Sequence, residues 1–536
     1  MSRPKRKQRS SVRLTWDSKV RLEGSFEEGV LNQGLETTEV VLPLPPSAQG
    51  RYRPELEPEV SPDRMNRLIH GDNLSALSSL IGEGLASSVD LIYIDPPFLS
   101  NSDYHHRITV DKEVFTLKRP SYRDRWTREA YLDMIYPRLM LMHRLLGERG
   151  KIFVHCDWRT NSLIRLLLDE IFGAENFLNE IVWSYGGRGA KATSGQFARN
   201  HDTILVYGRS RKARLKKVYV DRVLTEDEAR SIGCRTDESG RFFKTAPRGD
   251  YTDESVKALE RQGRIYRTRS GNIRIKYFMD RRGEMVVEKR PVGDVWDDIP
   301  DAMHSPLRER TGFPTQKPEM LLERIIESAT EKGDLVCDLF GGSGTTAVVA
   351  ERMGRRWIVC EGSAAGVQVA RARLITECAA PFAIERVASD GEKDAAVPAG
   401  GSLLILDGPV IDGGRNGNIE VSLGIKDYRI EDGACPVLPD PARKDPLLLI
   451  DYWAVDWDYD HRIFRSRWQS IRGNGKRAGR VAATARALLI DRPRTVAVRA
   501  VDIFGNETEV VTGLGKDRRT ALSASCSGVT KHNGRG

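Results

Sequence analysis

Cysteine is scarce in this sequence and is not arranged to bind metal or to form cross-links. The 536-residue chain contains seven cysteines, and no two of them form a Cys-x-x-Cys pair. Zinc sites and disulfide frameworks need closely spaced or regularly paired cysteines. We therefore predict no metal site and a set of reduced thiols, which is typical of a cytoplasmic protein.

Long hydrophobic runs are missing as well. The longest aliphatic run near the end of the chain, 446–455, is far too short to span a bilayer. The N-terminus is basic but lacks the apolar stretch that a signal peptide needs. These absences predict a soluble, intracellular protein with no membrane partner.

Acidic residues are too few to balance the basic ones. The chain has 84 Lys and Arg against 75 Asp and Glu, which gives a net charge of +9. Such a balance is compatible with a polyanionic partner but is also found in proteins that bind no nucleic acid. The length predicts two to four domains.

Short apolar runs alternate with amphipathic segments in two parts of the chain. This alternation predicts strands and helices of an α/β layered sheet. The expected strands are 89–94, 151–156, 181–183, 334–338 and 357–360, and the expected helices are 127–147, 161–172 and 345–353. After about residue 385, glycines and prolines separate short β-prone runs, which predicts a β-rich C-terminal domain.

A glycine-rich loop, Asp338 to Thr346, lies between an expected strand and an expected helix. Glycines let the backbone approach a ligand, and amides at a helix start favour a negative group. A phosphate-binding loop would need Gly-Lys-Ser/Thr, but Thr345 follows Gly344; the dinucleotide pattern G-x-G-x-x-G is absent too. Elimination favours S-adenosylmethionine, and a purely structural turn is the alternative.

Glu361 supports a cofactor site. It ends the expected strand that follows the glycine-rich loop, about 20 residues further on. In dinucleotide-binding folds an acidic residue at this place accepts hydrogen bonds from ribose hydroxyls. Without the loop, a surface glutamate would be the default interpretation.

A second motif, Asp95-Pro96-Pro97-Phe98, directly follows the expected strand 89–94. The two prolines end the strand and fix an extended bend. The Asp95 carboxylate and the Pro96 carbonyl can then accept both hydrogens of an amino group and orient its lone pair for attack. Phe98 offers a flat face for a base. The motif therefore predicts methylation of an exocyclic amine.

With these two motifs in this order, the chain resembles the β-group of amino-methyltransferases that act on DNA. The resemblance runs from about 66 to 376 and is nearest to modification subunits of type III restriction systems. Gly71-Asp72-Asn73 resembles the element that contacts the cofactor adenine, and the segment 315–318 resembles the wall at its methionine end. Phe98 replaces the commoner Tyr, which keeps stacking but removes a hydroxyl.

The motifs and the resemblance together define the expected site. The catalytic residues are Asp95, Pro96, Pro97 and Phe98. The residues expected to bind S-adenosyl-L-methionine are Asp72, Gln316, Lys317, Pro318, Asp338, Phe340, Gly341, Gly342, Gly344, Thr345, Thr346 and Glu361. We interpret Trp126 and Trp183 as packing residues.

The resemblance implies the methylated base. In this family Asp at the first motif position usually accompanies adenine N6, and Ser accompanies cytosine N4. Asp95 therefore favours a site-specific adenine-N6 methyltransferase. The alternatives are cytosine N4, methylation of RNA, and a DNA-recognition subunit of a helicase–nuclease restriction complex.

Double-stranded DNA is the expected substrate, and the target base must leave the stack to be reached. Basic runs at 209–217 and 261–290 are expected to contact phosphates; a solvated charged face is the alternative. The further candidate partners are a restriction helicase–nuclease subunit and a second copy of the chain.

We thus expect a Rossmann-like methyltransferase sheet with an inserted target-recognition region and a β-rich C-terminal domain. The expected parts are a basic arm and linker (1–65), the catalytic half (66–183), the target-recognition region (184–300), the cofactor-binding half (301–385), and the C-terminal domain with a disordered tail (386–536).

Overall fold

The structure is a computed structural model that describes most of the chain. The described residues are 12–22, 34–45, 48, 50–58, 65–105, 108–110, 113–115, 120–186, 197–378, 380–388, 402–415, 417–430, 445–472 and 480–515. The chain divides into two compact units, one formed by 1–215 together with 295–536 and the other by 216–294.

An eleven-stranded sheet forms the centre of the larger unit. In spatial order its strands are β19 (Val295–Trp296), β10 (Phe177–Ser184), β11 (His201–Gly208), β9 (Leu146–Cys156), β4 (Val89–Ile94), β20 (Leu335–Asp338), β21 (Arg356–Glu361), β3 (Asn66–His70), β22 (Phe382–Val387), β1 (Leu35–Val41) and β26 (Phe464–Ser466). The strands from β9 to β22 are parallel, whereas β11 and β1 run antiparallel to these neighbours. The structure confirms the Rossmann-like α/β sheet.

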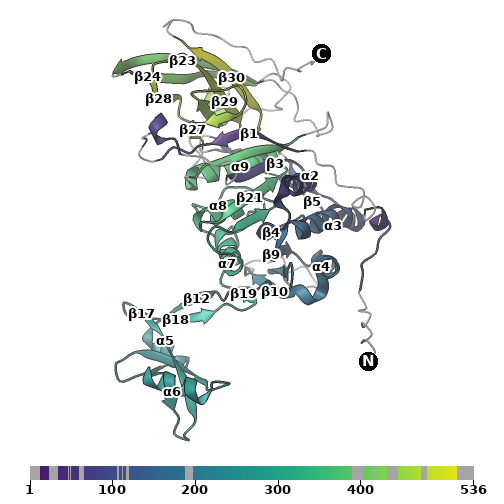
Figure 1. Ribbon diagram of the computed structural model, residues 1–536, viewed down its shortest axis with the longest axis vertical. Coiled ribbons are helices and arrows are strands. Elements are labelled where there is room, and N and C mark those ends of the chain that lie inside the picture. Colours follow the sequence, from purple (N-terminus) through teal and green to yellow (C-terminus); the bar gives the residue numbers. More distant parts are fainter. Residues whose placement is uncertain are drawn as a thin grey trace, which may run out of the picture. The chain divides into compact units, whose positions relative to one another are not determined.

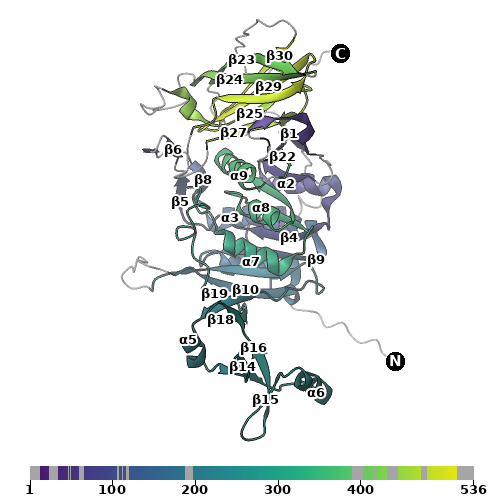
Figure 2. The ribbon, with the colours of Figure 1, turned by 90° about the vertical axis from the view of Figure 1, so that its left-hand side faces the viewer.

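Helices cover both faces of this sheet, as Figure 1 shows. The helices are α2 (Asn73–Leu80), α3 (Arg128–Leu145), α4 (Asn161–Leu168), α7 (Glu319–Ala329), α8 (Thr345–Arg352) and α9 (Ala364–Glu377). Helices α7, α8 and α9 lie on the face that Figure 2 turns toward the viewer, and α2, α3 and α4 lie on the other. Because helices shield both faces, β4 can be a nearly continuous apolar run.

The local signals read from the sequence account for several element boundaries. Thr127, the first residue of the expected helix 127–147, caps α3 by accepting a hydrogen bond from the backbone N–H of Ala130. Asp72 caps α2 and Ser363 caps α9 in the same way. Gly173, at φ 86°, ends the helical segment that begins at Asn161.

The expectation of an arm and linker over 1–65 is wrong for residues 35–41. They form strand β1, which pairs with β22 and β26 inside the central sheet. Glu39 on β1 is completely buried; its carboxylate accepts a hydrogen bond from the Tyr452 hydroxyl at 2.6 Å and pairs with Arg371 at 3.3 Å and Arg499 at 3.4 Å. A buried charge is tolerated when it is paired in this way.

The C-terminal region is β-rich, as expected. One sheet contains β2 (Arg51–Tyr52), β28 (Thr484–Ile490), β24 (Asn418–Ile430) and β23 (Ser402–Arg415), and the other contains β27 (Trp468–Ile471), β25 (Ile450–Asp456), β29 (Arg494–Asp502) and β30 (Glu507–Leu514). Side chains of both sheets form one apolar core. The expected disordered tail at 516–536 lies outside the described residues.

The smaller unit has its own two sheets and two helices. Its elements are β12 (Tyr219–Leu224), α5 (Glu226–Ser231), β13 (Arg235–Thr236), β14 (Phe242–Pro247), α6 (Asp253–Arg261), β15 (Ile265–Arg267), β16 (Ile273–Phe278), β17 (Asp280–Arg282) and β18 (Met285–Pro291). It is narrower than the expected region 184–300, because β11 and β19 belong to the central sheet.

The remaining elements are short. They are the hairpin pairs β5 (Ser102–His105) with β8 (Pro120–Asp124) and β6 (Ile108–Val110) with β7 (Glu113–Phe115), and the single turns η2 (Pro54–Leu56), η4 (Ile81–Leu85), η5 (Asp169–Gly173), η6 (Ala174–Asn176) and η7 (Pro446–Leu449). Across the described residues, we find every helix too short or too polar to cross a membrane.

Candidate active site

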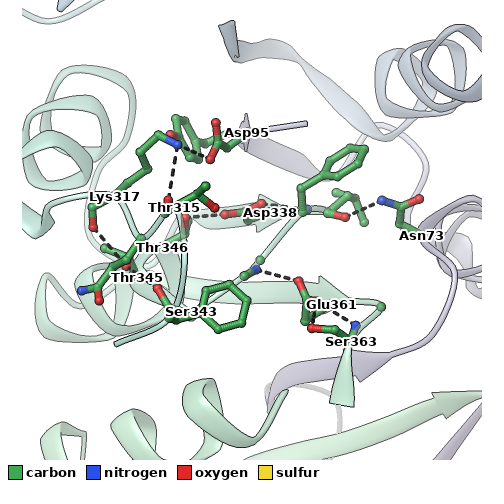
Figure 3. A pocket seen from close by; sticks show the side chains of 18 of the residues that line it. Asn73, Asp95, Thr315, Lys317, Asp338, Ser343, Thr345, Thr346, Glu361 and Ser363 are labelled. Carbon is green, nitrogen blue, oxygen red and sulfur yellow. Dashed lines mark hydrogen bonds and ion pairs between the residues drawn. The ribbon is translucent and has the colours of Figure 1, made fainter. Parts of the chain in front are cut away.

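A cavity of about 390 Å³ opens at the carboxyl ends of the central parallel strands. Strands β3, β4, β20 and β21 all end there, so segments far apart in the sequence meet around it. Ligands in open α/β sheets bind at this edge. Figure 3 shows the side chains that line the cavity.

Most of the predicted site residues meet in this one cavity. Those that line it are Asp72, Asp95, Pro97, Gln316, Lys317, Asp338, Phe340, Gly341, Gly342, Thr345, Thr346 and Glu361. Pro96, Phe98, Pro318 and Gly344 are not among the lining residues and lie next to ones that are. The two motifs, the segment 95–98 and the glycine-rich loop 338–346, therefore share a single cavity.

The glycine-rich loop passes so close to its neighbours that side chains are excluded at two positions. A Cβ on Gly341 would lie 2.2 Å from Cγ1 of Val359. Gly344 has a φ of 74°, and a Cβ there would lie 2.7 Å from Cβ of Ala370. The loop can therefore keep its backbone at the cavity wall only with glycine at these places.

Glu361 fixes the loop while facing the cavity. Its Oε2 accepts a hydrogen bond from the Gly342 amide at 2.8 Å, and its Oε1 accepts from the amide and hydroxyl of Ser363 at 2.7 and 2.6 Å. Burial raises the pKa of this carboxyl, and these hydrogen bonds oppose the rise. A carboxylate oxygen has about two acceptor positions. Both positions of Oε1 are used by Ser363, so Glu361 can accept one further hydrogen bond from a ligand, at Oε2.

Asp338 holds the start of the same loop. Its carboxylate accepts hydrogen bonds from the Thr346 hydroxyl at 2.5 Å and from the Phe340 amide at 2.9 Å. Burial nevertheless raises the pKa of Asp338 to about 7.

The raised pKa of Asp338 predicts a pH-dependent stability. In the unfolded chain Asp ionises near pH 4, whereas the folded protein keeps this proton up to about pH 7. The folded state therefore binds more protons in that window, and its stability falls as the pH rises through it. In Asp338→Asn this contribution disappears, so we expect the melting temperature of the wild type to fall more than that of the variant between pH 5 and pH 7. Parallel slopes in calorimetry would contradict this assignment.

Asp95 has one engaged oxygen and one unengaged oxygen. Its Oδ2 forms an ion pair with Nζ of Lys317, which also lies 5.4 Å from the centre of the Phe98 ring. Its Oδ1 is buried and makes no hydrogen bond in the described part of the protein. Buried polar atoms almost always have a hydrogen-bond partner, so Oδ1 is available to accept a hydrogen bond from a ligand in the cavity (Figure 3).

Several residues around the cavity were not predicted as site residues. Asn73, Phe313, Thr315, Ser343 and Ser363 line it. The Asn73 amide donates a hydrogen bond to the Leu339 carbonyl at 2.7 Å and thereby ties α2 to the glycine-rich loop. Asn73, Thr315 and Ser343 lie inside segments that the sequence marked as parts of the site, so their position in those segments was a signal that could have found them.

Arg138 was missed because nothing in the sequence connects it to the cavity. It lies in the middle of α3 and forms an ion pair with Asp72 at 2.6 Å. The same guanidinium donates to the side-chain oxygen of Asn73. Arg138 thus anchors the acidic element that was expected to contact the cofactor.

A buried chain of polar side chains lies behind the catalytic motif. The Tyr93 hydroxyl and Nδ1 of His155 are 3.1 Å apart, and Nε2 of His155 lies 3.1 Å from the carboxylate of Asp202. Burial opposes ionisation of Asp202, but the hydrogen bond with His155 and the charges nearby outweigh it and lower the pKa of that carboxyl. Since the His155 ring centre is 5.7 Å from that of Phe98, this row of hydrogen-bonded side chains packs against the last residue of the catalytic motif.

The two tryptophans interpreted as packing residues differ. Trp183 is 3% exposed and donates its indole N–H to the Ile299 carbonyl at 2.9 Å, which confirms a packing role. Trp126 lines the cavity and also a neighbouring one. Its indole nitrogen is buried and has no hydrogen-bond partner among the described residues. Trp126 is therefore part of the site wall.

The comparison with known proteins agrees with this arrangement. The family model of the DNA methylases, of the N6/N4 type, matches residues 89–371, which is more than half of the chain. The chain therefore belongs to this family of S-adenosylmethionine-dependent methyltransferases.

Three curated proteins illustrate the similarity. The type II methyltransferase M.EcaI of Enterobacter cloacae is 30% identical over 322 residues, which cover 55% of this chain and 66% of that protein. The StyLTI Mod subunit of a type III restriction-modification enzyme of Salmonella typhimurium is 28% identical, covering 53% of this chain and 49% of that subunit. The DNA adenine methyltransferase YhdJ of Escherichia coli is 25% identical, covering 62% and 90%. The chain thus spans about two thirds of the first and half of the second.

Proposed function

We propose that this protein transfers a methyl group from S-adenosylmethionine to N6 of an adenine extruded from duplex DNA. The observation that carries the proposal concerns Oδ1 of Asp95, in the cavity that the glycine-rich loop also lines: it is buried and has no hydrogen-bond partner among the described residues. Membership of the DNA methylase family supports it.

The cavity fits the cofactor at its glycine-rich wall. Gly341 and Gly342 let the loop backbone stay at the cavity wall, because a Cβ on Gly341 would strike Val359 and Gly342 has a left-handed φ of 51°. Oε2 of Glu361 has acceptor capacity for a ribose hydroxyl. Asp72, which Arg138 holds in place, would bind the adenine end, and Lys317 and its neighbours would wall the methionine end. The bound cofactor supplies an electrophilic methyl group on a sulfonium.

Asp95 would orient and deprotonate the target amine. One N6 hydrogen is donated to Oδ1 of Asp95 and the other to the Pro96 carbonyl, so that the nitrogen lone pair is directed at the methyl group. As N6 gains the methyl group it must release one proton, and Oδ1 is the acceptor. Lys317 compensates the charge of Oδ2 and keeps the carboxylate in one orientation.

Adenine is favoured over cytosine by two observations. Asp95 occupies the first motif position, and the similar protein YhdJ is named an adenine methyltransferase. The test is mass spectrometry of nucleosides from duplex DNA treated with the purified protein and methyl-labelled cofactor. N6-methyladenine is the expected product; N4-methylcytosine, or label in RNA alone, would refute the proposal.

A second cavity, of about 380 Å³, offers a place for the DNA strand beside the extruded base. It adjoins the catalytic loop at Leu99 and shares Trp126 with the first cavity. Trp158 on its rim is 50% exposed, and the Arg199 guanidinium lies 4.0 Å from the centre of its indole ring. Exposed aromatic and cationic groups together suit bases and phosphates of a nucleic-acid strand.

Removal of the Trp158 ring should therefore weaken DNA binding and spare the chemistry. In Trp158→Ala we expect the KM for DNA to rise roughly tenfold, which is the scale of one lost stacking contact, with kcat and cofactor affinity little changed. Val511→Ala, another exposed apolar site but on β30, serves as the control. An unchanged KM in Trp158→Ala would remove this cavity from the DNA path.

Sequence recognition is proposed for the smaller unit. Residues 216–294 contain 19 Lys and Arg against 14 Asp and Glu. Exposed Tyr277 and Tyr251 add aromatic surface.

A restriction subunit is a further proposed partner, supported only by the similarity to Mod subunits. Co-purification with an ATP-dependent nuclease would test this proposal. A protein that purifies alone and methylates DNA fully would argue against it.

A further inference from the structure

The backbone that follows the catalytic motif is gathered around one buried carboxylate. Pro96 and Pro97 have no amide hydrogen, so Phe98 is the first donor after Asp95. Asp124 accepts hydrogen bonds from the amides of Phe98 at 3.2 Å, Leu99 at 3.0 Å and Ser100 at 2.7 Å. These are the first three amide hydrogens that follow the prolines, and all three converge on one side chain.

The loop held by Asp124 has an unfavourable backbone conformation. Leu99 has a φ of 59°, in the left-handed region that side chains with a Cβ avoid. Successive amides directed at one anion form a concave arrangement that stabilises such a backbone. Asp124 is only 1% exposed. The hydrogen bonds described for its carboxylate come from these three loop amides.

Asp124 lies 24 residues after Ser100, the last of the three loop residues whose amides it binds. It is the last residue of β8 and pairs with Ser102, the first residue of β5. The loop that contains Leu99 therefore begins at the catalytic motif and ends at this pair of strands. Two residues after Asp124, Trp126 lines the cavity, and Thr127 caps the start of α3. One carboxylate thus fixes both the catalytic loop and the segment that walls the cavity.

We infer that Asp124 is a positioning residue for methyl transfer, which holds Leu99 in the left-handed conformation so that Pro97 and Phe98 face the base site. Asp124 touches neither the reacting amine nor the methyl donor in this arrangement. The inference rests on the proposed function, since it assigns Asp124 a part in the same reaction.

The test compares Asp124→Asn, Leu99→Gly and the double variant in the full-length protein. Asn keeps the size of Asp but presents an NH2 group to at least one loop amide, so the loop loses its restraint. We expect kcat to fall roughly 100-fold, the scale of a small misplacement of reacting groups, with cofactor and DNA affinity nearly unchanged. Because glycine adopts a left-handed φ without strain, Leu99→Gly in the same chain should restore part of the lost kcat.

The control is Asp502→Asn in the C-terminal domain. Asp502 is fully buried and also accepts hydrogen bonds from two amides of its own turn, Phe504 and Asn506, both at 2.8 Å. It should change thermal stability without changing kcat. Wild-type kcat in Asp124→Asn, or a double variant no more active than the single one, would overturn the inference.

Hydrogen exchange keeps the inference testable if Asp124→Asn fails to fold. In the wild-type protein the amides of Phe98, Leu99 and Ser100 should exchange at least roughly 100-fold more slowly than in an unstructured peptide. Free exchange at these three amides would overturn the assignment without any activity measurement. A wild-type protein that protects them but methylates no DNA would refute the proposed function alone.

Discussion

Replacement of Asp95 by Asn is expected to lower methyl transfer by roughly 1000-fold or more while the protein still binds S-adenosylmethionine. Asn presents one acceptor oxygen and an NH2 group, so it cannot both pair with Lys317 and accept a proton from N6. The loss should fall on kcat, because the contact matters when charge develops on the amine. Single-turnover methylation and isothermal titration of the cofactor would measure the two properties separately.

Asp90 offers a matched control for this experiment. It lies on β4, the strand that Asp95 directly follows, and its carboxylate accepts a hydrogen bond from the Leu335 amide at 2.9 Å, away from the cavity lining. Asp90→Asn should keep nearly full activity at moderate temperature. Normal turnover by Asp95→Asn would show that the amine is not held by this carboxylate.

Replacement of Gly341 by Ala is expected to weaken cofactor binding by roughly tenfold or more and to destabilise the fold by about 1–3 kcal/mol. The new Cβ would meet Cγ1 of Val359 at 2.2 Å and the Cys360 carbonyl oxygen at 3.2 Å. Since both neighbours belong to β21 inside the sheet, the loop must move instead, and it moves into the cavity. Cofactor titration and thermal unfolding would measure the two effects.

The clash can be relieved from the other side. Val359→Ala removes the γ carbon that the added methyl group would strike, so the double variant should regain cofactor affinity relative to Gly341→Ala, although Val359→Ala alone costs stability. Gly513→Ala, at a position where no atom of the described residues lies within 4 Å of the added Cβ, controls for the glycine change itself. Equal affinity of Gly341→Ala and wild type would show that this loop does not contact the cofactor.

The site residues that could be predicted from the sequence are those that lie at or directly after the end of a strand. Asp95 and Glu361 directly follow or end apolar strands, and strands of a parallel sheet bring such residues to a common edge. The glycines in the loop predicted a close approach of its backbone to a neighbour. The structure has such an approach at Gly341, where an added Cβ would lie 2.2 Å from Cγ1 of Val359. These signals are local, so a single sequence contains them.

Contacts across long sequence distances were not predictable. The ion pair of Lys317 with Asp95 joins positions 222 residues apart, and no periodicity marks Asp124 as the partner of a loop that ends 24 residues earlier. Strand β1 was missed because Glu39 is charged yet completely buried. Its partners Arg371 and Arg499 are supplied by a helix and by the C-terminal domain, which only tertiary structure brings together.

The two connections to residues 216–294 have a consequence for how such enzymes diversify. The chain leaves the central sheet after β11 and returns at β19, and both strands pair with β10, one on each side. Recombination that exchanged the inserted segment would therefore join the new segment to two strands, β11 and β19, whose pairing with β10 already fixes their positions. New inserts can thus arise in evolution while the strands that position Asp95 and Glu361 stay unaltered.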